Sequence, residues 1–241
     1  MARLPILMYH NVSDEEAKSF NLTISTKKLE QQLKYLVKQN YTFLFVSDLE
    51  ERTHIPAKSI VLTFDDVTEN QLLYALPLLQ HYNVKATFFI PFYYIGKTDL
   101  WNNGEGTPDV KIMTIEQLKS LDPQVIELGH HSYFHNKYAT MSEAEIQDDF
   151  DRSYEVIVKN KLNVYPALAY PYGNYPKKGS EKDQFFKLLE KNQIKMAFRI
   201  GNRVNAFPFR ERYEIQRIDV KGHQSLFHFK WKLRWGKKLL F

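Results

Sequence analysis

The sequence predicts a single-domain α/β fold with a mainly parallel sheet, either a barrel or a doubly wound sheet. Short apolar segments alternate along the chain with amphipathic helical patterns, which is typical of repeated strand–helix units. Several apolar segments lack a polar face, as do strands that are covered on both sides. The chain has 241 residues, of which 44% are hydrophobic and 25% charged, enough for one large core. No repeat or composition shift marks a domain boundary.

Eight segments are expected to be strands because they are short, apolar and bounded by turn or helix signals. They are Ile6–Tyr9, Thr42–Val46, Ile60–Phe64, Ala86–Ile90, Val125–Leu128, Ala167–Tyr170, Lys195–Arg199 and Ile215–Val220.

The intervening helices have readable signals of their own. Apolar residues recur on one face over residues 26–39 and 180–192. Capping-box patterns at Thr114 and Ser142 predict that helices begin there. A further helix contains Pro77, so we expect it to kink or to begin late.

The composition restricts which metal ligands are possible, but it does not identify a binding partner. The chain has no cysteine, so disulfides are excluded and any metal must be held by nitrogen and oxygen ligands. The net charge is +5, which could attract nucleic acid, anionic lipid or an acidic glycan, and charge alone does not choose among them. No apolar run has the length of a signal peptide core or a transmembrane helix. If Met1 is the native start, we expect a cytoplasmic protein.

The strongest local signal is the pair Asp65 and Asp66, directly after the strand expected at Ile60–Phe64. The carboxyl ends of strands are where α/β folds place their active sites. Crowding two like charges costs energy that a bound cation would relieve. The alternative is a turn and helix cap.

A second signal follows the strand expected at Val125–Leu128. His131 and His135 are four residues apart, so on one helical turn their imidazoles would face the same way and share an ion. Two imidazoles and one carboxylate leave coordination positions open for water and substrate, as hydrolytic metal sites require. A histidine pair alone can also be structural, but two strand ends with complementary ligands favour a metal site.

These residues resemble the polysaccharide deacetylase (NodB-like) family. The resemblance rests on segments 63–66, 129–135 and 170–173, which have that family's order and approximate spacing, and extends to Pro5–His10 and Ala86–Ile90. The opening segment is similar to the branch that acts on poly-N-acetylglucosamine. The resemblance implies a distorted (β/α) barrel of the NodB type over residues 1–225, followed by a basic, aromatic C-terminal segment at 226–241.

The resemblance also implies roles for individual residues. Asp66, His131 and His135 would bind a divalent metal, with zinc as the first expectation and cobalt or nickel as alternatives. Asp65 would be the general base. Tyr172, which follows Pro171, would offer its backbone N–H to the oxyanion.

Three departures from the family pattern are visible. Val67 stands where the family usually has glycine, Ala169 where it has the arginine that orients the base, and the Asp-Trp motif has no counterpart. We expect Arg217 to replace the missing arginine. His223 is the predicted general acid, and His10 competes for that role or lines the site.

We therefore expect a metal-dependent N-deacetylase that acts on an N-acetylated amino sugar in envelope polysaccharide or lipid-linked glycan synthesis. A catalytically inactive glycan-binding protein with the same fold is the alternative. No nucleic-acid module is present. The C-terminal segment is expected either to contact the inner face of a membrane or to dock on the barrel as a helix. The polar stretch at residues 96–109 is expected to form a substrate lid.

Overall fold

A computed structural model describes residues 1–101 and 110–236 of the chain. Parallel strands form a closed barrel, because β2 pairs with β6 from Ile6↔Val61 to Tyr9↔Phe64. The structure thus selects the barrel over the doubly wound sheet. The barrel strands are β2 (Ile6–Tyr9), β6 (Ser59–Asp65), β7 (Ala86–Ile90), β8 (Ile126–His130), β9 (Val164–Ala169), β10 (Met196–Ile200) and β12 (Ile215–Asp219). One more parallel strand, β5 (Thr42–Leu44), pairs with the start of β6.

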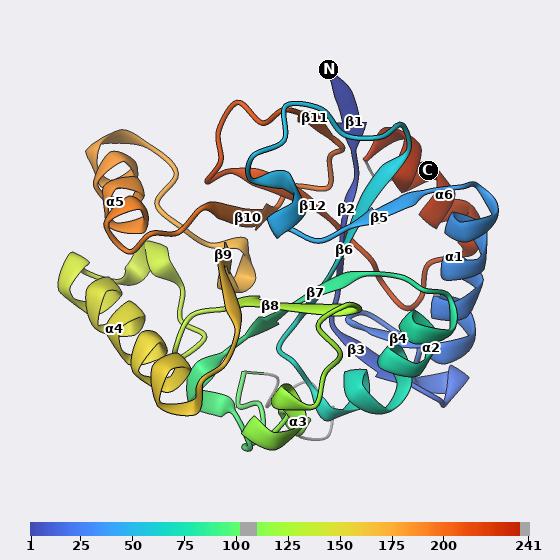
Figure 1. Cartoon of the computed structure of the whole chain (residues 1–241), viewed down its shortest axis with the longest axis horizontal. Coiled ribbons are helices and arrows are strands. Elements are labelled where there is room, and N and C mark those ends of the chain that lie inside the picture. The colour runs from blue at the N-terminus through green and yellow to red at the C-terminus, as the bar shows by residue number, and fades with distance from the viewer. Residues whose placement is uncertain (102–109, 237–241) are drawn as a thin grey trace.

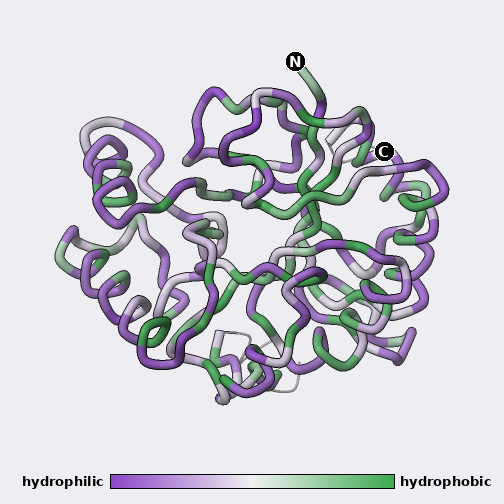
Figure 2. The backbone as a smooth tube through the Cα atoms, in the orientation of Figure 1, coloured by the Kyte–Doolittle hydropathy of each residue, from purple (hydrophilic) through white to green (hydrophobic). Residues whose placement is uncertain are grey.

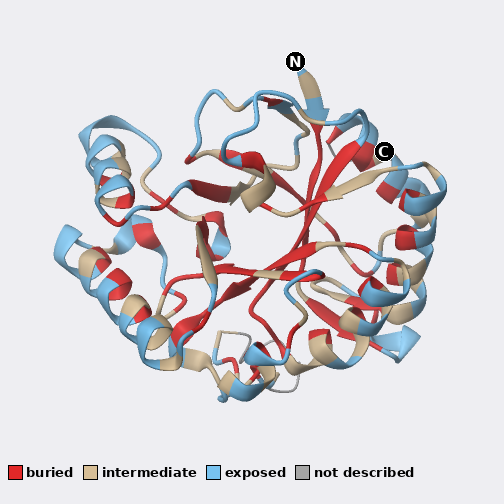
Figure 3. Cartoon of the chain, viewed as in Figure 1, coloured by how far each residue is buried: buried red, intermediate tan, exposed pale blue. Residues whose placement is uncertain are grey.

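Helices surround the barrel on its outer side (Figure 1). They are α1 (Thr26–Lys38), α2 (Leu76–His81), α3 (Ile115–Lys119), α4 (Glu143–Asn160), α5 (Gly179–Lys191) and α6 (Leu226–Trp235). The strands are hydrophobic and buried, whereas the outward faces of the helices are hydrophilic and exposed (Figures 2 and 3). Among the described helices, none has the length and hydropathy that crossing a bilayer requires.

The predicted helix starts are confirmed. Thr114 and Ser142 each form a full capping box. The helix that contains Pro77 begins late: residues Gln71–Ala75 form a π-helical turn (η3), and α2 follows with Pro77 in its first turn. Proline is tolerated there because the first-turn N–H has no intrahelical acceptor.

Strand alternation determines which side chains enter the barrel. In β6, Ile60, Leu62 and Phe64 pack beneath the helices, whereas Val61 packs in the barrel interior. Thr63 and Asp65 follow Val61 by two and four residues and so lie on the same face of the strand, which means that they also face inward. The same alternation carries Arg217 inward two residues after the interior residue Ile215.

Smaller elements without a distinct signal in the sequence complete the fold. Two short sheets form, β1 (Ala2–Leu4) with β11 (Asn205–Phe207) and β3 (Asn11–Ser13) with β4 (Thr23–Ser25). The 3₁₀ turns are Glu16–Lys18, Ser47–Leu49, Phe92–Tyr94, Tyr138–Thr140 and Pro171–Gly173.

The C-terminal segment docks on the barrel as a helix. Phe229 and Leu233 of α6 are buried, and the Phe229 ring meets Tyr35 of α1 edge-on at 6.5 Å. Most of the expected lid, residues 102–109, and the end of the chain, residues 237–241, lie outside the described residues.

Candidate active site

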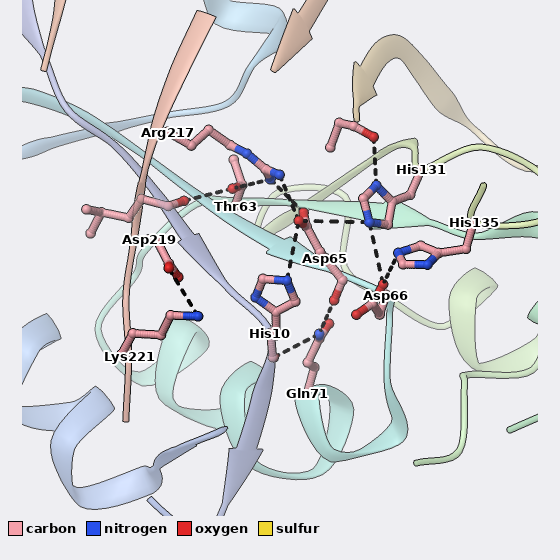
Figure 4. A network of polar contacts seen from close by, with 12 residues as sticks. His10, Thr63, Asp65, Asp66, Gln71, His131, His135, Arg217, Asp219 and Lys221 are labelled. Carbon is pink, nitrogen blue, oxygen red and sulfur yellow. Dashed lines mark hydrogen bonds and ion pairs between the residues drawn. The ribbon is translucent and has the colours of Figure 1, made fainter. Parts of the chain in front are cut away.

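An arginine–carboxylate pair lies inside the barrel at the carboxyl end of β6. Arg217 Nη1 and Nη2 donate to Asp65 Oδ1 and Oδ2 at 2.6 and 2.7 Å, and Nη1 also donates to Thr63 Oγ1 at 3.2 Å (Figure 4). Arg217 is 1% exposed and Asp65 2%. Arg217 thus makes the contact that the sequence led us to expect, although it comes from β12 rather than from the position of Ala169.

The charge state of Asp65 is the outcome of two opposing effects. Burial alone would raise its pKa, but the Arg217 guanidinium and the nearby His131 outweigh burial and hold the pKa well below the usual range. The carboxylate is therefore ionised throughout the neutral range, which a general base requires.

Three potential metal ligands meet beside this pair. The ligand atoms of Asp66, His131 and His135 all lie within 4.8 Å of one another, and all three side chains are buried. Nε2 of each histidine is 3.5 Å from Asp66 Oδ1. Asp66 follows β6 and both histidines follow β8, so the fold brings two strand ends together (Figure 4).

The predicted helical turn between the two histidines is wrong. Residues 131–135 form an irregular loop in which Ser132 and His135 have φ angles of 65° and 58°. Asp149 of α4 holds this loop, because its Oδ2 accepts the backbone N–H groups of Tyr133 and Phe134 at 2.8 and 3.4 Å. The two imidazoles converge through loop geometry rather than through helical periodicity.

The turn after β6 is also left-handed. Asp66 and Val67 have φ angles of 75° and 43°, a region that β-branched residues rarely enter. Val67 is fully buried in the core beneath the helices, and its carbonyl accepts the Met113 N–H at 2.9 Å. The conformation that favours glycine in this motif is therefore kept here, and packing around Val67 offsets about 1–3 kcal/mol of backbone strain.

The donor set fits a divalent cation. His131 Nδ1 lies 2.7 Å from the Ala169 carbonyl, which can only accept, so this nitrogen donates and Nε2 presents its lone pair. Burial lowers the pKa of His131 to about 4 and that of His135 well below its usual range, so both imidazoles are neutral. Asp66 Oδ1 is buried with no hydrogen-bond partner among residues 1–101 and 110–236. Burial, followed by the Asp65 charge, raises the pKa of Asp66, a cost that a cation would remove.

His10, at the end of β2, lies against Asp65. Its Nε2 is 3.7 Å from Asp65 Oδ2. Gln71, in the π-helical turn, donates through Nε2 to the carbonyls of His10 and Asp65 at 3.0 and 2.6 Å. Sequence reasoning missed Gln71, because a glutamine early in a helix carries no signal that distinguishes it from a surface residue.

The structure does not bring His223 into this cluster. Its side chain is exposed in the loop before α6, and its ring packs against Phe20 at a centroid distance of 5.4 Å. Burial separates the two candidates for the general acid: the His10 side chain is 14% exposed and lies beside Asp65, whereas His223 lies on the surface. His130 is buried between Phe92 and Tyr154, as expected for a packing residue.

Aromatic rings flank His135. Trp101 stacks on the imidazole at 4.0 Å, and Tyr172 meets it edge-on at 4.8 Å. Tyr172 follows the buried Pro171 in a 3₁₀ turn, has a φ of 57° and is 48% exposed. The site therefore has an accessible aromatic surface next to the ligand cluster.

Asp149 gives a prediction about stability and pH. Burial raises its pKa to about 6, from an ordinary value of 3.8. The unfolded chain therefore loses this proton first as pH rises, and stability falls between about pH 4 and pH 6. Asp149→Asn removes that contribution, so the variant should gain about 3 kcal/mol relative to the parent protein across this interval.

Urea unfolding at several pH values measures that gain. Asp183→Asn, the same change at an exposed position in α5, is the matched control and should show no comparable trend. If the free energies of unfolding of the Asp149 variant and the parent protein differ by the same amount at every pH, Asp149 does not have a raised pKa in the folded protein.

Known proteins that resemble this chain include deacetylases of polysaccharides. The model of the family described as polysaccharide deacetylase matches residues 53–182, more than half of the chain. Poly-beta-1,6-N-acetyl-D-glucosamine N-deacetylase of Staphylococcus aureus (strain MSSA476) is 28% identical over 172 residues, which cover 69% of this chain and 58% of that protein. The chain thus spans less than two thirds of that relative's length.

Several solved structures share the fold, among them the following two. The Streptococcus pyogenes deacetylase PplD in complex with acetate has a TM-score of 0.75 at 23% identity, covering 96% of this chain and 98% of that one. IcaB from Ammonifex degensii has a TM-score of 0.76 at 20% identity, covering 98% and 97%. Together with the family match, the barrel and the motifs on its strand ends, these findings show that the chain belongs to the polysaccharide deacetylase family.

Proposed function

We propose that this protein is a metal-dependent N-deacetylase that hydrolyses the acetamide of an N-acetylated amino sugar in a glycan. The observation that carries this proposal is the adjacency of two units. One is a buried cluster of Asp66, His131 and His135 suited to a cation, and the other is an ionised Asp65 held by Arg217. The name of the Staphylococcus aureus relative supports a polymer of N-acetylglucosamine as the substrate class.

Asp66, His131 and His135 would hold the metal, and a nitrogen-rich set with one carboxylate suits zinc, with cobalt or nickel as alternatives. When bound, a divalent ion supplies an acidified water and polarises the acetamide carbonyl. Asp65 then accepts the proton of the attacking water, and Arg217 keeps Asp65 ionised and fixes its orientation.

Two further residues beside the cluster are assigned roles in the reaction. The Tyr172 backbone N–H is assigned to the oxyanion, and the left-handed turn that follows Pro171 orients it. As the C–N bond breaks, the leaving amine needs a proton, and His10 is assigned to donate it. His10 is favoured over His223 because only His10 lies beside Asp65.

Acetate release from N-acetylglucosamine oligomers tests the proposal. We expect release by the purified protein, loss of release on chelation and recovery on adding zinc, cobalt or nickel. Elemental analysis should find one equivalent of metal, the stoichiometry of a single site with three protein ligands. Glycan binding without acetate release for every metal would instead support the inactive carbohydrate-binding protein.

Two further expectations concern the place of action. We expect the protein to be cytoplasmic and to lie at the inner face of a membrane. We also expect it to act on envelope polysaccharide or on a lipid-linked glycan. Cell fractionation with an antibody against the protein tests the location, and recovery of the protein outside the cell would contradict it.

A further inference from the structure

A groove of about 450 Å³ lies between α1 and α6, on the outside of the barrel. Its lining includes the basic residues Arg3, Lys230 and Arg234 and the aromatic residues Tyr35, Trp231 and Trp235, and no acidic residue among those that the structure describes. The reaction proposed above uses none of these residues.

The outer face of α6 has a regular pattern. Phe227, Trp231 and Trp235 recur every four residues, so they form one stripe along the helix. Phe227 is 63% exposed and Trp235 53%. Lys230 and Arg234 lie beside this stripe, whereas Phe229 and Leu233 point inward and anchor the helix.

The cations are held over aromatic rings. Lys230 Nζ lies 4.6 Å from the centre of the Tyr35 ring, and Arg234 Cζ lies 5.2 Å from that of Trp235. Arg3 donates to the Arg234 carbonyl, which ties the N-terminal strand to the end of α6. The groove therefore combines positive charge with exposed apolar rings on a docked helix.

We propose that this surface binds an anionic phospholipid bilayer. Phosphate headgroups match the three cations, and tryptophan and phenylalanine favour the boundary between headgroups and acyl chains. A soluble polyanion would satisfy the cations alone and would leave the Phe227–Trp231–Trp235 stripe in water.

The position of the groove sets the orientation of the bound protein. Arg3 precedes β2 and Tyr41 precedes β5, so the groove lies toward the end of the barrel where strands begin. His10, Asp65 and Asp66 lie where strands end. Because the Phe227–Trp231–Trp235 stripe runs along the whole of α6, a protein docked through it lies with the side of its barrel against the bilayer, and the active site at the strand ends faces a glycan beside the membrane. This last step rests on the proposed function, whereas lipid binding does not.

Vesicle co-sedimentation tests the inference. The full chain should bind vesicles of phosphatidylcholine mixed with phosphatidylglycerol at low salt, bind them weakly at high salt, and not bind pure phosphatidylcholine. Lys230→Gln with Arg234→Gln should lower the partition coefficient about 30-fold, because each cation near an anionic surface contributes about a factor of five. Phe227→Ser should weaken binding at both salt concentrations.

Matched controls separate this surface from general charge. Lys187→Gln with Lys191→Gln removes the same charge from exposed positions on α5, on the other side of the barrel (Figure 1), and should leave most of the binding intact. Val158→Ser removes an apolar side chain that is 76% exposed on α4 and is the control for Phe227→Ser. Thermal unfolding confirms that each variant is folded.

The outcomes are distinct. Equal loss of binding in the α5 variant, or equal binding to neutral vesicles, would overturn the inference. So would retention of the protein by an acidic glycan but not by vesicles. Acetate release from soluble oligomers should be the same in all these variants, so a failure here does not bear on the proposed reaction.

Discussion

Asp65→Asn is expected to abolish acetate release almost completely while the protein keeps its metal. The change removes the proton acceptor but leaves Asp66, His131 and His135 in place. Loss of a general base typically lowers turnover by about 10² to 10⁴-fold. Steady-state kinetics on acetylated oligomers and metal analysis on the same sample measure the two effects separately.

Asp66→Asn is the matched control, because it makes the same chemical change one residue further along. It should lower metal content as well as turnover, and added metal should recover part of the activity. If Asp65→Asn loses its metal to the same extent as Asp66→Asn, the assignment of base and ligand between the two residues is wrong.

Arg217→Met is expected to be the most disruptive single change in the barrel. It leaves Asp65 buried without its bidentate partner, and removing one member of a buried ion pair typically costs about 3–5 kcal/mol of folding free energy. Burial would then dominate and raise the pKa of Asp65. Any remaining activity should therefore fall off at higher pH than in the parent protein, on the acid side of the profile.

Two variants distinguish this account from general misfolding. Arg217→Lys keeps the charge without the two parallel hydrogen bonds, so its stability and activity should be intermediate. Combining Arg217→Met with Asp65→Asn removes both charges and should recover part of the stability lost in Arg217→Met alone. Additive losses in the double variant, measured by urea unfolding, would contradict the direct coupling.

The sequence supported the fold and the ligand cluster because their signals are local. Buried strands are recognisable as apolar runs, and Asp66, His131 and His135 stand directly after two such runs. Periodicity could not predict the closure of the barrel, because pairing of β2 with β6 is a long-range contact with no periodic signature, and only the family resemblance implied it.

The sequence contained weaker indications of the residues proposed to transfer protons or to orient Asp65. Arg217 was identified only as a substitute for a missing arginine, and its contact with Asp65 spans 152 residues of sequence. His223 was favoured by its late position, but only the structure shows that His10 occupies the space beside Asp65. The left-handed loop at His135 and the support from Gln71 and Asp149 depend on tertiary packing, which periodicity does not encode.

The closure of the barrel also bears on how the protein becomes competent during folding. The residues of the candidate metal site follow β6 and β8, in the middle of the chain, whereas His10 follows β2 and Arg217 lies in β12, the first and last strands of the barrel. A folding intermediate with an open barrel could hold an ion and still lack a working base. Pairing of β12 between β2 and β10 is what brings Arg217 to Asp65, so the buried ion pair forms only when the barrel closes.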